Sequence, residues 1–129
     1  MNRPLLALAL ALATTTLCAQ PAAAPEAPAA HQGTRQLVAQ AADGTVTLAA
    51  KDVTVHGTNV RYEPQPQKNT VGYWTNQADW VSWEFEIVKA DSFEVEALQG
   101  CGKGSGGAAV AFAVGEQTLA MTVEDTGGF

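Results

Sequence analysis

The sequence predicts an all-β protein, an antiparallel β-sandwich, from three observations. Apolar residues recur at every second position in several short segments. Glycine, proline and Asp-Gly or Gly-Glu pairs separate these segments as turn formers. No segment sustains the 3.6-residue apolar period of an amphipathic helix over several turns. Short strands divided by turns at regular spacing are typical of sandwiches and jelly rolls.

The clearest predicted strand covers residues 81–88. Val81, Trp83 and Phe85 alternate with Ser82 and Glu84. This period of two describes a strand with one buried face and one solvated face. We therefore expect the apolar set to lie in the core and the glutamates to face water.

The other predicted strands follow the same test. A strand at 93–97 would form a hairpin with the first one through a turn at 89–92. Pro64 and Pro66 interrupt regular pairing, so 63–70 is predicted as a loop. For residues 34–42, a short helix is an alternative to irregular structure. The remaining predicted strands are 45–48, 53–56, 60–62, 110–114 and 119–123.

The first 19 residues have the pattern of a secretory signal peptide. Arg3 supplies a positive charge, and an unbroken Leu/Ala run follows at 5–13. This run is too short for a membrane-spanning helix, so we expect a secreted or periplasmic protein with no transmembrane segment in the mature chain. Lipid attachment at Cys18 is the alternative, but Leu17 is larger than the small residue expected before a lipidated cysteine.

The rest of the chain divides into a tether and a domain. Residues 20–42 are rich in alanine and contain three prolines, which predicts a flexible tether. Residues 43–129 are predicted to form the β-sandwich module. Without the signal peptide, Cys101 is the only cysteine and has no partner for an intramolecular disulfide, so we expect a small, half-buried apolar side chain.

Composition and motifs exclude several functions. The net charge of −6 disfavours nucleic acid as a partner. No Ser-His-Asp order or G-x-S-x-G motif is present, and the two histidines lie far from any cluster of metal ligands. The glycines of 102–107 match a dinucleotide-binding motif by letter, but no helix follows them. We therefore predict no catalytic residues, no metal ligands and no enzyme activity.

One aromatic cluster precedes the main strand. Tyr73, Trp74 and Trp80 are interleaved with polar residues that include Asn76 and Gln77. An aromatic ring can stack on the C–H face of a sugar, and amides can hydrogen-bond its hydroxyls. We therefore predict that these five residues bind carbohydrate. Packing as a structural lid is the alternative for Trp80.

From residue 48 to 129 the chain resembles carbohydrate-binding modules of families six and thirty-five, within the galactose-binding-like β-sandwich superfamily. The likeness rests on VGYWTNQADWVSWEFEI, on KADSFEVEALQGCGKGSGG and on VGEQTLAMTVEDTGGF. It implies a jelly-roll module that binds glycans without catalysis and is sometimes attached to a sulfatase or a fucosidase. It also implies that Tyr73 lines the binding cleft and that Phe129 faces it.

The sequence departs from these families at two places. Their first strand often carries two glutamates that bind a structural calcium ion, whereas the matching residues 49–52 are Ala-Ala-Lys-Asp. We therefore expect no cofactor, since the usual calcium ligands are not matched. The families also continue for several strands beyond the loop at 126–129, so we expect a sandwich that is incomplete at its C-terminus. Missing strands would expose sheet edges.

Two other functions stay open at this stage. The aromatic cluster could pack against a partner protein, which would make the chain a structural or interaction domain of the cell envelope. The module could also be a fragment of a larger sulfatase or glycosidase. Carbohydrate binding is the preferred hypothesis because the aromatic and amide residues lie together.

Overall fold

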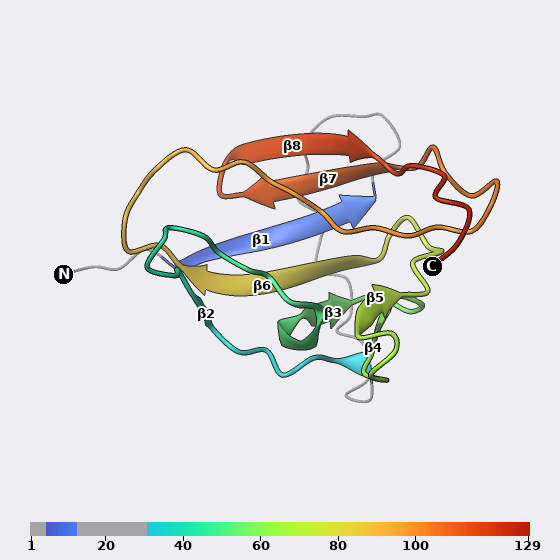
Figure 1. The fold of residues 1–129 in the computed structure, drawn as a ribbon, viewed down its shortest axis with the longest axis horizontal. Helices are drawn as coiled ribbons and strands as arrows, with labels where there is room; N and C mark the ends of the chain where they lie inside the picture. The colour runs from blue at the N-terminus through green and yellow to red at the C-terminus, as the bar shows by residue number, and fades with distance from the viewer. Residues whose placement is uncertain (1–4, 13–30) are drawn as a thin grey trace.

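The computed structural model describes residues 5–12 and 31–129, which form an all-β fold (Figure 1). The predicted all-β class is therefore confirmed. A one-turn 3-10 helix, η2 (Ala50–Asp52), precedes β3. The strands are β1 (Leu5–Leu12), β2 (Val38–Ala39), β3 (Thr54–His56), β4 (Arg61–Glu63), β5 (Thr70–Gly72), β6 (Trp80–Glu86), β7 (Ala109–Val114) and β8 (Gln117–Thr122).

Six of these strands form one sheet in the order β2-β6-β1-β7-β8, with β3 also paired to β6. The pairs are antiparallel except for β2, which runs parallel to β6. The remaining strands, β4 and β5, form a separate antiparallel pair. A second sheet of only two short strands does not establish a sandwich, so that finer architecture stays a prediction.

Strand β6 has the predicted phase. Val81, Trp83 and Phe85 are buried, whereas Glu84 is exposed. The indole Nε1 of Trp83 donates a hydrogen bond to the carbonyl oxygen of Ala49 at 2.8 Å, so burial leaves this polar group satisfied. The buried members of the core cluster are Val53, Val55, Val60, Val81, Trp83, Phe85, Val110 and Phe112.

The hairpin of β7 and β8 also follows the sequence pattern. Its turn is Gly115-Glu116, and Gly115 has a positive φ of 57°, as a two-residue hairpin turn requires. Val110 and Phe112 point into the core. The predicted strands at 53–56, 60–62, 110–114 and 119–123 thus correspond to β3, β4, β7 and β8 within one or two residues at each end.

Two predicted strands are absent from the structure. Residues 45–48 and 93–97 have no strand assignment, and Phe93 and Val95 are 46% and 44% exposed. The predicted hairpin after β6 fails because both edges of β6 are already occupied. Strand β1 takes one edge, and β2 and β3 share the other. The long connection from β6 to β7 therefore crosses the sheet as an irregular segment (Figure 1).

Of two shorter segments, one differs from the prediction and one agrees with it. The alternative helix at 34–42 is wrong, since Val38 and Ala39 pair with Phe85 and Glu86 as β2. Strand pairing satisfies the backbone there without the long apolar face that a helix needs. The predicted loop at 63–70 is present at residues 64–69, and its end residues Glu63 and Thr70 pair as the last residue of β4 and the first of β5.

The N-terminal predictions fall partly outside the described residues, which exclude 1–4 and 13–30. Within the predicted signal peptide, residues 5–12 form β1 between β6 and β7. Within the predicted tether, the backbone N–H groups of Gly33 and Thr34 donate hydrogen bonds to the carbonyl oxygens of Val53 and Lys51. Residues before 43 are therefore bonded to the predicted module. Among the described residues, no helix has the length and apolar character to cross a membrane.

Candidate functional site at the loop end

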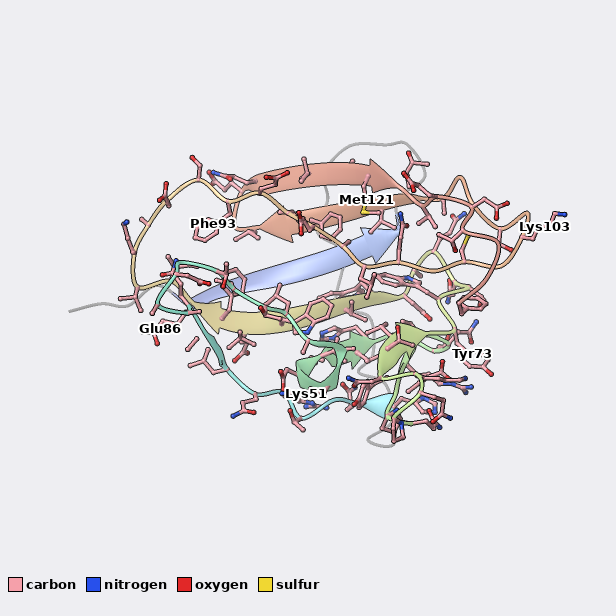
Figure 2. All side chains as sticks on the ribbon, in the orientation of Figure 1. Lys51, Tyr73, Glu86, Phe93, Lys103 and Met121 are labelled. Carbon is pink, nitrogen blue, oxygen red and sulfur yellow. The ribbon has the colours of Figure 1, made fainter. Side chains whose placement is uncertain are left out.

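Four connecting segments leave the large sheet at the same end. Strand β6 starts at this end and β8 finishes there, because the register aligns Trp80 with Ala11, Ala111 and Ala120 in turn. In Figure 2, Tyr73 and Lys103 lie toward this end, opposite Phe93. We call the segments 57–60, 73–79, 100–108 and 123–129 the loop end.

Tyr73 follows β5 directly and lies on the surface of the loop end. Its side chain is 53% exposed. Its φ of 56° places the backbone in the left-handed region, which is unfavourable for a large residue, and strained residues of this kind cluster at functional sites. The guanidinium carbon of Arg61 lies 3.4 Å from the ring centroid. This cation–π contact holds one face of the ring and leaves the rest toward solvent.

The buried carboxyl group of Asp79 connects two of these segments, 57–60 and 73–79. Asp79 is 1% exposed, and its carboxyl oxygens accept hydrogen bonds from the backbone N–H groups of Thr58, Asn59 and Val60 at 2.8 to 3.0 Å. These bonds satisfy three consecutive donors of the 57–60 turn. Asp79 therefore fixes that turn against the segment that carries Tyr73.

Side-chain hydrogen bonds connect the same two segments at the surface. The amide nitrogen of Asn76 donates to the hydroxyl of Thr58 at 3.3 Å, and that of Asn59 donates to the hydroxyl of Thr75 at 3.0 Å. Each bond uses one of two amide protons, so both amides retain donor capacity. Gln77 is exposed beside them. The structure thus brings Asn59 and Asn76 together across the two segments, and Asn76 and Gln77 lie on the segment that carries Tyr73.

Trp74 and Trp80 differ from Tyr73 in their surroundings. Trp74 is half-buried, packs against the core and donates from Nε1 to the carbonyl oxygen of Asp79 at 3.0 Å. Trp80 stacks on His56 with a centroid distance of 3.7 Å. Because residues alternate along β6, Trp80 faces away from buried Val81. Both indoles therefore have packing roles, and the lid interpretation of Trp80 fits this stacking.

Phe129 lies in a different part of the loop end. Its side chain is fully exposed, and its ring comes near the glycines at 100 and 102. The segment around it is held by Thr126, whose hydroxyl accepts from the backbone N–H of Cys101 at 2.7 Å. The buried thiol of Cys101 donates to the carbonyl oxygen of Glu124 at 3.0 Å. Phe129 thus belongs to the part of the loop end formed by 100–108 and 123–129, whereas Tyr73 belongs to 73–79.

Residues 49–52, which match the calcium-binding stretch of the resembled families, hold an ion pair. The ammonium of Lys51 donates to both carboxyl oxygens of buried Asp52 at 2.7 Å. This bond lowers the pKa of Asp52; burial opposes the shift, and the hydroxyl of Thr34 supports it. In the described part of the chain, no group of three or more His, Cys, Asp or Glu residues could hold a metal ion.

Three contributors to the site were not predicted from the sequence. Arg61 and Asn59 lie in a segment treated only as strand and turn, and Asp79 looked like an ordinary loop residue. The Gly57-Thr58-Asn59 run is turn-forming and could have indicated a second loop. No sequence pattern showed that this loop meets the segment at 73–79, because the contact spans about 20 residues.

Comparison of the chain with protein families, with curated proteins and with solved structures finds no match. The resemblance to carbohydrate-binding modules stays a prediction.

Proposed function

We propose that this chain is a non-catalytic module that binds glycans and that its site is the loop end around Tyr73. The observation that carries the proposal is the backbone conformation and the exposure of Tyr73. A large aromatic side chain is held in a strained backbone conformation, with one face supported by Arg61 and half of its surface exposed. Strain of this kind persists where the surroundings impose it, and a binding role explains why it is retained.

The surrounding groups suit a sugar. A pyranose presents a C–H face that can stack on the open part of the Tyr73 ring, while its hydroxyls need donors and acceptors within hydrogen-bond reach. Asn76 and Asn59 supply amide groups, and Gln77 lies on the same segment. Trp74 would anchor the segment that carries Tyr73 through its core packing and its hydrogen bond to Asp79, and Phe129 would extend contacts toward the glycine-rich segment.

The proposal includes the finer architecture and the place of action. An antiparallel β-sandwich of jelly-roll type, galactose-binding-like and incomplete at the C-terminus, would present these loops as a shallow cleft. Secretion or export to the periplasm would bring the module to extracellular polysaccharide. Attachment to a sulfatase or glycosidase would then let the module hold that enzyme on its substrate.

A glycan array followed by titration of one bound oligosaccharide tests the proposal. Tyr73→Ala should weaken binding about tenfold or more, since it removes the stacking surface. The matched control is Phe93→Ala, which truncates another half-exposed aromatic residue at the far end of the molecule (Figure 2). No glycan bound by the wild-type chain, or equal affinity for both variants, would contradict it, and capture of a protein partner through Tyr73 would favour an interaction domain.

A further inference from the structure

The guanidinium group of Arg61 is a positive charge held against Tyr73 at the loop end. Arg61 is the first residue of β4, and its partner in β5 is Gly72, the residue before Tyr73. Its Cζ atom lies 3.4 Å from the centroid of the Tyr73 ring. This distance is close to the contact separation of two carbon atoms, about 3.5 Å. The planar guanidinium therefore lies flat on the ring, because an edge-on approach would push its N–H hydrogens into the ring.

A guanidinium that lies flat on an aromatic ring keeps its hydrogen-bond donors available. Its five N–H groups lie in the guanidinium plane and point away from the ring normal. Within residues 5–12 and 31–129, the Arg61 side chain forms no ion pair and donates no hydrogen bond. Figure 2 shows Tyr73 at the border of the molecule, where a ligand can approach. The stacked pair therefore offers a full positive charge and a planar set of donors.

The two carboxylates of residues 57–79 have other partners. An oxygen of Glu63 accepts a hydrogen bond from the ammonium of Lys68 at 2.9 Å. Asp79 is buried and accepts from three backbone N–H groups of the 57–60 turn. Neither carboxylate forms an ion pair with Arg61. A chain with a net charge of −6 thus presents a cation without a direct counter-charge at the proposed glycan site.

Resting on the proposed function, we propose that the glycan is acidic and that Arg61 binds its acidic group, a carboxylate or a sulfate. A guanidinium binds such oxyanions through two parallel, charge-assisted N–H···O bonds. Dense polyanions are opposed by the net charge of the chain. We therefore expect a glycan with isolated acidic groups, each available to a single arginine.

The stacking geometry also indicates which sugar unit carries the acidic group. Arg61 covers one face of the Tyr73 ring, so a stacked sugar takes the opposite face. Two successive contact separations place that sugar about 7 Å from the guanidinium plane. The acidic group therefore belongs to the unit next to the stacked one, which reaches Arg61 past the edge of the ring.

A glycan array that carries each backbone in three forms tests this inference. The forms are neutral, with one carboxylate and with one sulfate. The wild-type chain should bind an acidic form about tenfold more tightly than the neutral form of the same backbone. The carboxylate and sulfate arms show which group fits the site. Calorimetric titration with the best acidic trisaccharide and its neutral counterpart then gives the ratio of the two affinities.

Arg61→Gln should reduce this ratio to about one. A purely structural role of Arg61, in which it only holds the Tyr73 ring, would weaken both ligands equally and leave the ratio unchanged. Lys89→Gln is the matched control, because it removes one positive charge from an exposed residue beyond the far end of β6. It should keep the wild-type ratio, with both variants folded by circular dichroism.

Wild-type binding of the neutral form at least as tight as that of both acidic forms overturns this inference and leaves the proposed glycan site intact. An unchanged ratio in folded Arg61→Gln also overturns it. The wild-type comparison needs no variant, so it decides the matter even where Arg61→Gln does not fold. Absence of any bound glycan overturns both this inference and the proposed function.

Discussion

At the scale of single residues, the contact between Gly57 and Asp79 determines the shape of the loop end. Gly57 has a φ of 132°, and a Cβ atom added there would lie 2.2 Å from a carboxyl oxygen of Asp79. Only glycine combines this backbone conformation with this close approach. The missing side chain lets the buried carboxyl group reach the three backbone donors of the turn.

Gly57→Ala should therefore destabilise the fold by about 1–3 kcal/mol, through backbone strain and displacement of Asp79. Denaturant unfolding followed by tryptophan fluorescence measures the change. Gly128→Ala is the control, because a Cβ atom added there meets open space. Equal stability of the two variants would show that the Gly57 contact does not determine the turn.

The sequence indicated part of this residue-level arrangement. Tyr73 was predicted to be exposed and to stack on a sugar ring, and the structure places it on the surface. Trp74 was predicted to share that role, but its indole is committed to the core and to Asp79. Position in the chain could not separate these neighbours, because the direction of each side chain depends on the positive φ of Tyr73. A period-two pattern does not predict such a turn.

At the scale of secondary-structure elements, β6 organises the sheet. It pairs with β1 on one edge and with β2 and β3 on the other. Its inward residues supply two of the three aromatic side chains of the core cluster, Trp83 and Phe85. An element with neighbours on both edges and a buried face depends strongly on the packing of that face.

Trp83→Ala should cost about 3–5 kcal/mol, because it leaves a large cavity and an unpaired Ala49 carbonyl oxygen. Glu84→Ala, one residue along on the solvated face, should change stability by no more than about 0.5 kcal/mol. Thermal or urea unfolding of both variants provides the comparison. Similar losses of unfolding free energy from the two substitutions would mean that the assignment of Trp83 to the buried face of β6 and Glu84 to its solvated face is incorrect.

The strands also show which features of the fold the sequence patterns predict and which they do not. Residues 81–86, 110–114 and 119–122 combine alternation with a local turn, and their strands were predicted. The equally regular alternation at 93–97 gave no strand, since its expected partner is occupied. Conversely, β1 was interpreted as an export segment because it is an apolar Leu/Ala run, although the same letters also alternate every second residue. Pairing partners are non-local and are not contained in either pattern.

At the scale of the whole molecule, one sheet carries its connecting segments to a common end, and we propose that this end binds glycan. The sheet in this structure includes β1, between β6 and β7. If export removes residues 1–19, those two strands lose their shared neighbour and must be joined in another way. The segments 57–60 and 73–79 do not depend on β1 for the hydrogen bonds that connect them.

The most direct test of the central claim is a map of backbone amide chemical shifts during titration with an oligosaccharide that binds in the array. The account predicts that the largest changes occur at residues 57–60 and 73–77, with saturation at a single affinity. Changes confined to β8 or to residues 88–98, or no changes in the two segments around Tyr73, would contradict it.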